Sequence, residues 1–291
     1  MKEKLLSHLS VYCELTKPGV TFMVLLSTLA GFYLGSQGSL DFVLLFNTLF
    51  GTFLVAGGTN ALNQLIEREM DARMKRTRKR PLPAGRLNPS QAQLFGSIIS
   101  MVGIVYLCLA VNLLTGLLAA LTLGSYVFIY TPLKRRTSFA TAIGAVPGAI
   151  PPMGGWAAAR GEVGPEACVL FAILFFWQIP HFLAIAWLYR ADYNRGKFPV
   201  LPVIDGNGTL TGMHIIVNCL ALLSVSLLPT LLGVTGNVYF VGALILGLGF
   251  LASGVRAAFL KSTFCARRLL QASIMYLPLL LALMSIDKTG L

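Results

Sequence analysis

Charged side chains are scarce in this sequence. Asp, Glu, Lys and Arg together make up 12% of its 291 residues, about half of the roughly 25% that soluble domains carry. Hydrophobic residues reach 56%, and the mean hydropathy is +0.75. Long apolar runs recur along the whole chain, and a helix needs about 20 such residues to cross a bilayer. The composition therefore excludes a soluble globular domain and indicates an integral membrane protein.

The sequence also lacks the alternating ten-residue segments that a membrane β-barrel requires. We therefore expect an all-α fold, a polytopic membrane protein whose single domain covers residues 1–291. Nine transmembrane helices are expected, at residues 19–36, 42–62, 93–110, 113–130, 139–158, 167–188, 213–232, 236–254 and 268–286. The span 139–158 contains several Pro and Gly residues, which a membrane helix tolerates where it packs closely or lines a cavity.

Cysteine pairs with metal-binding or redox spacing are absent. The five cysteines are scattered and mostly fall inside expected spans, at Cys13, Cys108, Cys168, Cys219 and Cys265. A disulfide framework or a zinc site would need closer and more regular spacing. We therefore expect reduced thiols that serve packing, and we look elsewhere for the chemistry of the protein.

The net charge of +12 is distributed unevenly, which argues against nucleic-acid binding. With nine spans, 21 of the 23 Lys and Arg residues fall at the N-terminus or in the loops after spans 2, 4, 6 and 8, and only Arg160 and Lys288 fall on the other side. The positive-inside rule places the cation-rich side in the cytoplasm. The N-terminus lacks the pattern of a cleavable signal or transit peptide. We therefore expect a bacterial inner membrane, a cytoplasmic N-terminus and a periplasmic C-terminus.

Three polar residues share one helix face at the end of the second expected span. Asn63, Glu67 and Asp71 are spaced four residues apart, and each step of four turns a helix by a net 40°, so they form one stripe. Carboxylate and carbonyl oxygens are the ligands that Mg²⁺ prefers. The spacing also fits a solvated helix end with ordinary charge pairs, and spacing alone leaves both readings open.

A basic loop follows this acidic stripe and favours the metal-site reading. Seven cations lie between Arg73 and Arg86, among them Arg76 and Arg80. Arg matches phosphate with a planar fork, and Lys offers a point charge. Some of these cations also serve membrane topology by attracting anionic lipid. Acids followed by bases at a membrane edge indicate a site for diphosphate with Mg²⁺.

Two later segments add polar residues on the same expected side. Lys134 and Arg135 follow the fourth span and are candidate phosphate contacts, although topology alone also explains them. Asp192, with Lys197 nearby, begins a second acidic site after the sixth span. Within that span, His181 is a candidate substrate contact or an ordinary hydrogen-bonded interior histidine, since polar groups inside membranes usually mark function.

At these motifs the chain resembles the intramembrane prenyltransferase (UbiA) superfamily, most closely its heme-modifying branch. The family pattern Asn-x-x-x-Asp-x-x-x-Asp, followed by Met-x-Arg-Thr-x-x-Arg-Pro-Leu, stands here as Asn63, Glu67, Asp71, Met74, Arg76, Thr77, Arg80, Pro81 and Leu82. The segments YTPLKRRT, PGAIPPMGGW, WQIPHF and YRADYNRGKFPVLPV follow in the same order. The resemblance covers most of residues 14–205. Glu67 replaces the more common Asp, and Asp192 lacks the second aspartate of the wider superfamily.

The resemblance implies nine helices around a central cavity with a cytoplasmic polar cap. It implies farnesyl diphosphate as donor, heme B as acceptor and heme O as product. Asn63, Glu67, Asp71 and Asp192 would be the catalytic residues that hold Mg²⁺. The substrate contacts would be Arg76, Arg80, Lys134, Arg135, His181 and Lys197. The bilayer surrounds the protein, and heme A synthase or a terminal oxidase is a candidate protein partner.

Two other functions compete with this interpretation. A related enzyme with an aromatic or quinone-precursor acceptor would share the acidic stripe, but the WQIPHF and RTRKRPL segments argue against it. A transporter would also use polar-lined helices. Transporters usually carry broken helices at matching positions in two halves, and only one such break, around Pro147 to Pro152, occurs here.

Overall fold

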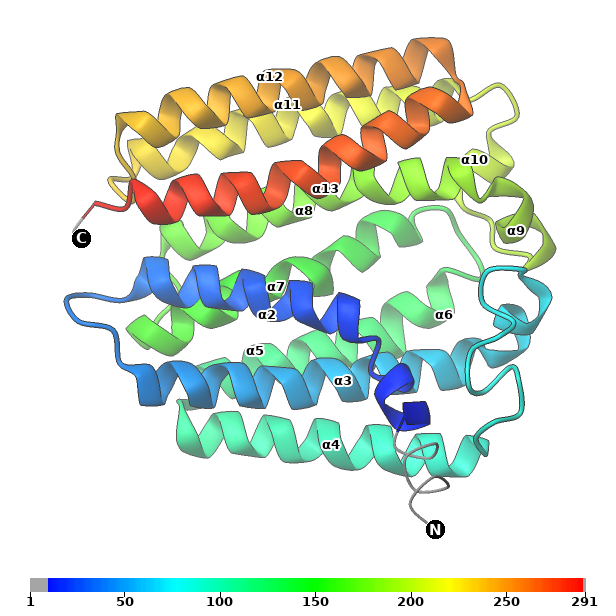
Figure 1. Ribbon diagram of the computed structural model, residues 1–291, viewed down its shortest axis with the longest axis horizontal. Coiled ribbons are helices and arrows are strands. Elements are labelled where there is room, and N and C mark those ends of the chain that lie inside the picture. Colours follow the sequence, from blue (N-terminus) through cyan, green and yellow to red (C-terminus); the bar gives the residue numbers. More distant parts are fainter. Residues whose placement is uncertain (1–9, 290–291) are drawn as a thin grey trace.

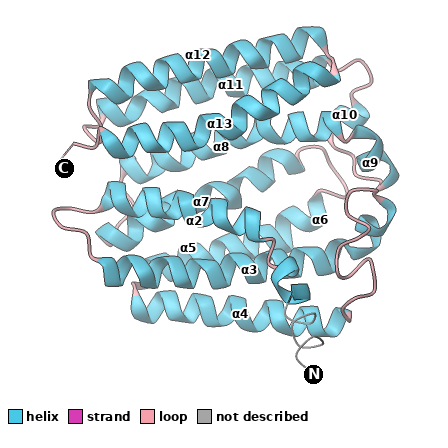
Figure 2. Ribbon diagram, viewed as in Figure 1, coloured by secondary structure: helices cyan, strands magenta, loops and turns pink. Residues whose placement is uncertain are grey.

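The computed structural model describes residues 10–289 and shows a bundle of long helices running side by side (Figures 1 and 2). No β-strand occurs in this described part of the chain. The helices are α2 (Pro18–Gly35), α3 (Phe42–Arg73), α4 (Pro89–Ala110), α5 (Leu113–Gly124), the π-helix η1 (Ser125–Tyr130), α6 (Thr131–Leu133), α7 (Ala140–Arg160), α8 (Pro165–Leu188), α9 (Arg190–Arg195), α10 (Leu201–Ile204), α11 (Thr209–Leu231), α12 (Asn237–Leu260) and α13 (Thr263–Ile286). The expected all-α membrane fold is confirmed.

Eight helical segments between residues 10 and 289 are long and apolar enough to cross a membrane. The segment 113–133, which combines α5, η1 and α6, counts as one of them. The Pro- and Gly-rich α7 is not among the eight, although it lies alongside α2 and α8 over much of the length of the bundle (Figure 1). A count of nine spans therefore stays a prediction, which depends on whether α7 crosses the bilayer with its neighbours.

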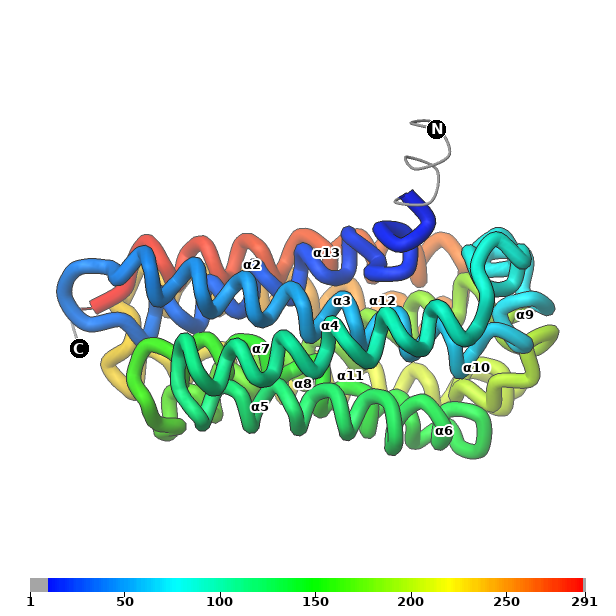
Figure 3. Tube along the Cα trace, turned by 90° about the horizontal axis from the view of Figure 1, so that it is seen from below, coloured from blue at the N-terminus to red at the C-terminus, as the bar shows by residue number. Residues whose placement is uncertain are grey.

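The two ends of the bundle differ in structure. The connections after α3, α6, α8 and α12 meet at one end, where α9 and α10 also lie (Figures 1 and 3). We call this the loop-rich end. It gathers the cation-rich segments that the sequence placed on one side, while the opposite end carries short connections and the end of α13. The side of the membrane that the loop-rich end faces stays a prediction.

Small residues allow α2 and α7 to pack closely despite three prolines within α7. A Cβ atom added at Gly31 would lie 1.9 Å from the carbonyl oxygen of Pro152, and one added at Gly155 would lie 2.0 Å from that of Thr28. These distances are far below van der Waals contact, so the two backbones touch. The sequence predicted that the Pro- and Gly-rich span either packs closely or lines a cavity, and these contacts demonstrate close packing.

A small apolar cluster attaches the loop after α3 to the rest of the bundle. Leu82 and Leu87 from this loop are buried against Leu15, Ala61 and Ala92. Burying each leucine side chain stabilises the fold by about 1.5–3 kcal/mol relative to exposure. The basic loop is therefore held in a fixed position near the polar end of α3.

The contact between α2 and α7 makes a stability prediction at two adjacent glycines. Gly155→Ala forces a methyl group into the Thr28 carbonyl, and overpacking of this kind costs about 1–3 kcal/mol. Gly154→Ala is the matched control, because nothing lies within 4 Å of its added Cβ. We expect only Gly155→Ala to lower the temperature at which the detergent-purified protein loses its monodisperse elution. Equal melting of the two variants would contradict the close contact.

Candidate active site

The acidic stripe lies on the last turns of α3, which continues as one helix to Arg73. Asn63, Glu67 and Asp71 are 1%, 3% and 1% exposed, so the stripe faces the protein interior and not solvent. The side-chain amide of Asn63 donates hydrogen bonds to Glu67 Oε1 at 2.8 Å and to Thr131 Oγ1 at 3.3 Å. The alternative of a solvated helix end is therefore wrong for these three residues.

Each acidic group of the stripe pairs with a cation from another segment. Lys134, just after α6, forms an ion pair with Glu67. Arg80, from the loop after α3, donates to Asp71 Oδ2 at 2.6 Å. Burial lowers the pKa of Lys134, but the negative charge of Glu67 more than offsets this, and the pKa is raised overall. Both expected phosphate contacts thus lie directly beside the carboxylates.

One carboxylate oxygen of the stripe has no partner among residues 10–289. This oxygen is the buried Asp71 Oδ1, whereas Oδ2 is paired with Arg80. A buried oxygen without a partner costs about 1–3 kcal/mol or more, because it has lost its hydration. The carboxylate is thus free to bind a hard cation on one side while an arginine holds the other side.

Lys17 belongs to this cluster although the sequence motifs did not single it out. Its Nζ donates to Asn63 Oδ1 at 2.8 Å. Burial, together with the nearby positive charge of Arg80, lowers the pKa of Lys17 to about 7. A lone lysine directly before Pro18 at the start of the first apolar run was the available signal, but positive-inside topology explained it equally well.

Asp192 connects the second acidic site to the loop after α3. It lies on α9 and is 8% exposed. Its carboxylate accepts hydrogen bonds from the backbone N–H groups of Lys75 at 3.2 Å and Arg76 at 3.3 Å, and pairs with Arg195. Burial raises the pKa of Asp192, but these donors outweigh it and lower the pKa overall. Asp192 thus bridges two segments that are 116 residues apart in sequence.

The remaining expected substrate contacts divide into two groups. Arg76 stacks over the Tyr189 ring at 5.3 Å, and Arg135 donates to the backbone carbonyl of Ile66 beside the stripe. Lys197 is exposed, and His181 lies within the bundle rather than at the stripe. The structure therefore joins Arg135 to α3 and Arg76 to Tyr189 and Asp192, and it shows no contact of Lys197 or His181 with the stripe among residues 10–289.

His181 occupies a separate polar contact between two helices. Its Nδ1 lies 2.7 Å from the Oγ of Ser273 on α13, and its ring stacks on Trp177 at 5.0 Å. The indole N–H of Trp177 donates to the Ser273 carbonyl at 2.9 Å. This arrangement fits the interior hydrogen-bonded histidine that was one of the two expectations, and it leaves Nε2 without an assigned partner.

The donor set at the stripe suits Mg²⁺ better than a softer metal. No three His, Cys, Asp or Glu side chains between residues 10 and 289 come close enough to form a complete metal site, and the five cysteines are free. Mg²⁺ usually takes one or two protein carboxylates and completes its shell with substrate phosphates and water. Glu67 and the free oxygen of Asp71 fit this pattern, while the oxygen of Asn63 accepts a hydrogen bond from Lys17.

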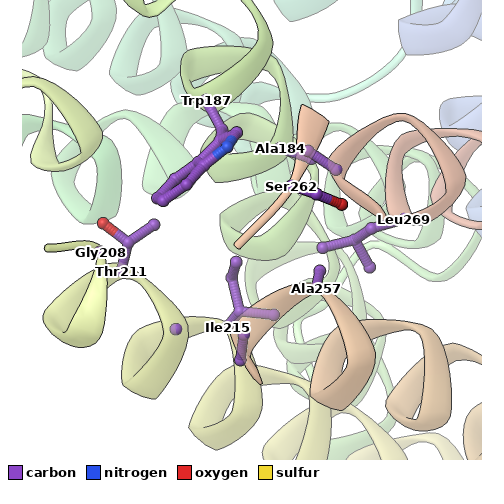
Figure 4. Close-up of a pocket in the computed structure, with 11 residues that line it drawn as sticks. Ala184, Trp187, Gly208, Thr211, Ile215, Ala257, Ser262 and Leu269 are labelled. Atoms are coloured by element: carbon purple, nitrogen blue, oxygen red, sulfur yellow. The ribbon is translucent and has the colours of Figure 1, made fainter. Parts of the chain in front are cut away.

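Two hollows lie at the loop-rich end, away from the stripe. The smaller, about 10 Å³, is lined by Trp187, Thr211, Ile215, Leu269 and neighbouring small residues (Figure 4). The larger, about 610 Å³, lies beside α9 and also touches Trp187. Neither is lined by a residue of the acidic stripe, and the central cavity stays a prediction.

Solved membrane proteins share this fold. A digeranylgeranylglyceryl phosphate synthase superimposes with a TM-score of 0.79 at 16% identity, covering 96% of this chain and 98% of the other. A UbiA homolog from Archaeoglobus fulgidus bound to GPP and Mg²⁺ gives a TM-score of 0.62 at 14% identity, covering 94% and 99%. At such identities the likeness establishes the fold alone.

Sequence comparison assigns the family. A protoheme IX farnesyltransferase from Solibacter usitatus is 50% identical over 289 residues, covering 96% of this chain and 99% of the relative. One from Aquifex aeolicus is 41% identical over 277 residues, covering 95% and 94%. The model of the UbiA prenyltransferase family matches residues 24–280. The chain therefore belongs to the UbiA prenyltransferase family.

Proposed function

We propose that this protein transfers the farnesyl group of farnesyl diphosphate to a vinyl group of heme B, with addition of water, to give heme O. The proposal rests on relatives of 40–50% identity that span nearly the whole chain and are named protoheme IX farnesyltransferase. The structural observation that carries it is the buried cluster at the end of α3, where acids and cations from three segments meet.

The cations of this cluster suit a diphosphate group. Arg80 and Lys134 neutralise Asp71 and Glu67, which avoids the cost of unpaired buried charge. A bound diphosphate offers them stronger, charge-assisted hydrogen bonds. Arg76 and Arg135 lie close enough to the same segments to add to the positive field. In the proposed complex, Arg80 and Lys134 bind the leaving diphosphate group.

Asn63, Glu67 and Asp71 would hold Mg²⁺ on the other side of the diphosphate. When bound, Mg²⁺ supplies Lewis-acid charge that stabilises the departing diphosphate. The side chain best suited to bind it is Asp71, since its Oδ1 is buried and without a partner. The oxygen of Asn63 accepts a hydrogen bond from Lys17 in the structure, so binding of Mg²⁺ through Asn63 would require this hydrogen bond to break.

The reaction breaks the C1–O bond of farnesyl diphosphate and releases diphosphate with both bonding electrons. The allylic carbon then adds to the terminal carbon of the heme vinyl group, and water supplies hydroxide to the carbon next to the porphyrin while one proton leaves. Arg80 and Lys134 stabilise the charge that develops on the leaving oxygen. The apolar bundle houses the farnesyl chain and delays the entry of water.

The location of the protein and its partners also follow from this proposal. The donor chain and the porphyrin are lipidic, so we place the reaction at the loop-rich end of the bundle, at the cytoplasmic face of a bacterial inner membrane, with the C-terminus on the periplasmic side. A docked heme A synthase or terminal oxidase stays a prediction.

Purified protein incubated with radiolabelled farnesyl diphosphate, Mg²⁺ and heme B tests the proposed function. Label on heme, with a mass increase equal to one farnesyl group plus one hydroxyl group, is the expected result. Label on an aromatic acceptor added in parallel would instead support the quinone-precursor alternative. Absence of labelled product, combined with substrate flux across vesicles, would support a transporter.

We expect Asp71→Asn to reduce heme O formation in membranes by about 100-fold or more, because even the loss of a residue that only orients a metal ligand typically costs about 10–100-fold. Glu69→Gln is the matched control, since its side chain is 76% exposed and lies off the stripe. It should retain wild-type activity. Undiminished activity in Asp71→Asn, at equal protein abundance, would remove Asp71 from the metal site.

For Asp192 we propose a positioning role that places the loop containing Arg76, because both carboxylate oxygens already accept hydrogen bonds. Asp192→Asn should raise the KM for farnesyl diphosphate and leave the Mg²⁺ concentration for half-maximal activity unchanged. Asp71→Asn, measured alongside, should raise that Mg²⁺ concentration. A higher Mg²⁺ requirement in Asp192→Asn would instead make Asp192 the fourth metal ligand that the sequence predicted.

A further inference from the structure

The larger hollow at the loop-rich end is not part of the acidic stripe. It has a volume of about 610 Å³, within the 300–1,000 Å³ range typical of small-molecule sites. Its lining comes from the end of α8, from α9 and α10, and from the turn into α13, through Trp187, Leu188, Arg190, Ala191, Asn194, Val203, Lys261 and Thr263. We call it the interfacial hollow.

The interfacial hollow is positively charged and partly apolar. Arg190 and Lys261 line it, and no acidic side chain does so in the described chain. Lys261 donates to Thr209 Oγ1 at 3.1 Å, and Arg190 has no ion pair among residues 10–289. The nearby carboxylate of Asp192 is directed to the loop after α3, where it binds Lys75 and Arg76. The two cations are therefore available for an anionic ligand.

The apolar part of the lining supplies a flat aromatic surface and aliphatic neighbours. Trp187 and Leu188 come from the last turn of α8, and Val203 from α10. Such a site suits an amphipathic molecule that carries acidic groups on one edge of a large apolar body. Heme B has this character, with two propionate carboxylates on one edge of the porphyrin.

We propose that the interfacial hollow binds the propionate edge of heme B, with Arg190 and Lys261 as the carboxylate contacts. The inference deepens the proposed function, on which it rests for the identity of the acceptor. The apolar body of the porphyrin would lie against Trp187, Leu188 and Val203 of the same lining.

Spectroscopic titration of the purified protein tests this site without any farnesyl diphosphate. Heme B and its dimethyl ester, which lacks the carboxylate charges, are each titrated while the Soret band is followed. The wild type should bind heme B more tightly than the ester. Arg190→Gln should weaken heme B binding by about tenfold or more, the size of one lost charge-assisted hydrogen bond, and leave ester binding unchanged.

Two further variants make the result specific. Lys261→Gln should give the same selective loss, and it provides a second measurement if Arg190→Gln folds poorly. Arg256→Gln is the matched control, because Arg256 is an exposed cation of α12 outside the hollow, and it should bind both hemes as the wild type does. An equal loss of affinity for heme B and for the ester in these variants would overturn the proposal. So would equal affinity of the wild type for the two ligands, and anionic lipid would then be the better candidate for the hollow.

This outcome is separable from the proposed function. If the titration shows no preference for heme B over its dimethyl ester, the heme site lies elsewhere in the protein. The assay for labelled farnesyl transfer to heme would still test the proposed function independently. Conversely, selective heme binding without transfer of label would support the hollow and contradict the proposed reaction.

Discussion

Pairing of buried charges at the end of α3 determines how the loop-rich end is arranged. Glu67 and Asp71 lie where water is excluded, and an unpaired charge there would cost several kcal/mol. Lys134 and Arg80 therefore have to reach them from two other segments. Asp192 likewise accepts hydrogen bonds from two backbone N–H groups of the loop after α3. The proposed diphosphate site uses these same cations, Arg80 and Lys134, which compensate the acids of α3.

The membrane explains why this polar cluster sits at one end of the bundle. The outer helix faces carry large apolar side chains, such as Phe22 and Leu109, which are 63% and 83% exposed in the isolated chain and suit contact with lipid. Between the helices, close contacts such as Gly31 against Pro152 leave little space for polar groups. In the proposed reaction, the charged groups of the substrates bind at the loop-rich end and their lipidic portions lie in the bilayer beside it.

Sequence reasoning predicted most of the helices, because apolar run length and proline tolerance are local properties of the chain. It placed the end of the second span near residue 62, whereas α3 continues to Arg73 through polar residues that the stripe argument already required. The π-helix Ser125–Tyr130 carried no recognisable signal. Long-range contacts, such as Lys17 with Asn63 and Asp192 with Lys75, depend on how distant segments pack. Residue spacing within one helix contains no information about them.

The most direct test of this account is a crystal structure with Mn²⁺ in place of Mg²⁺ and a non-hydrolysable farnesyl diphosphate analogue. Anomalous scattering from Mn²⁺ would locate the metal independently of the protein density. The account predicts a metal ion about 2.0–2.2 Å from Asp71 Oδ1, with the diphosphate between it and Arg80. A metal and diphosphate bound away from the end of α3 would contradict it.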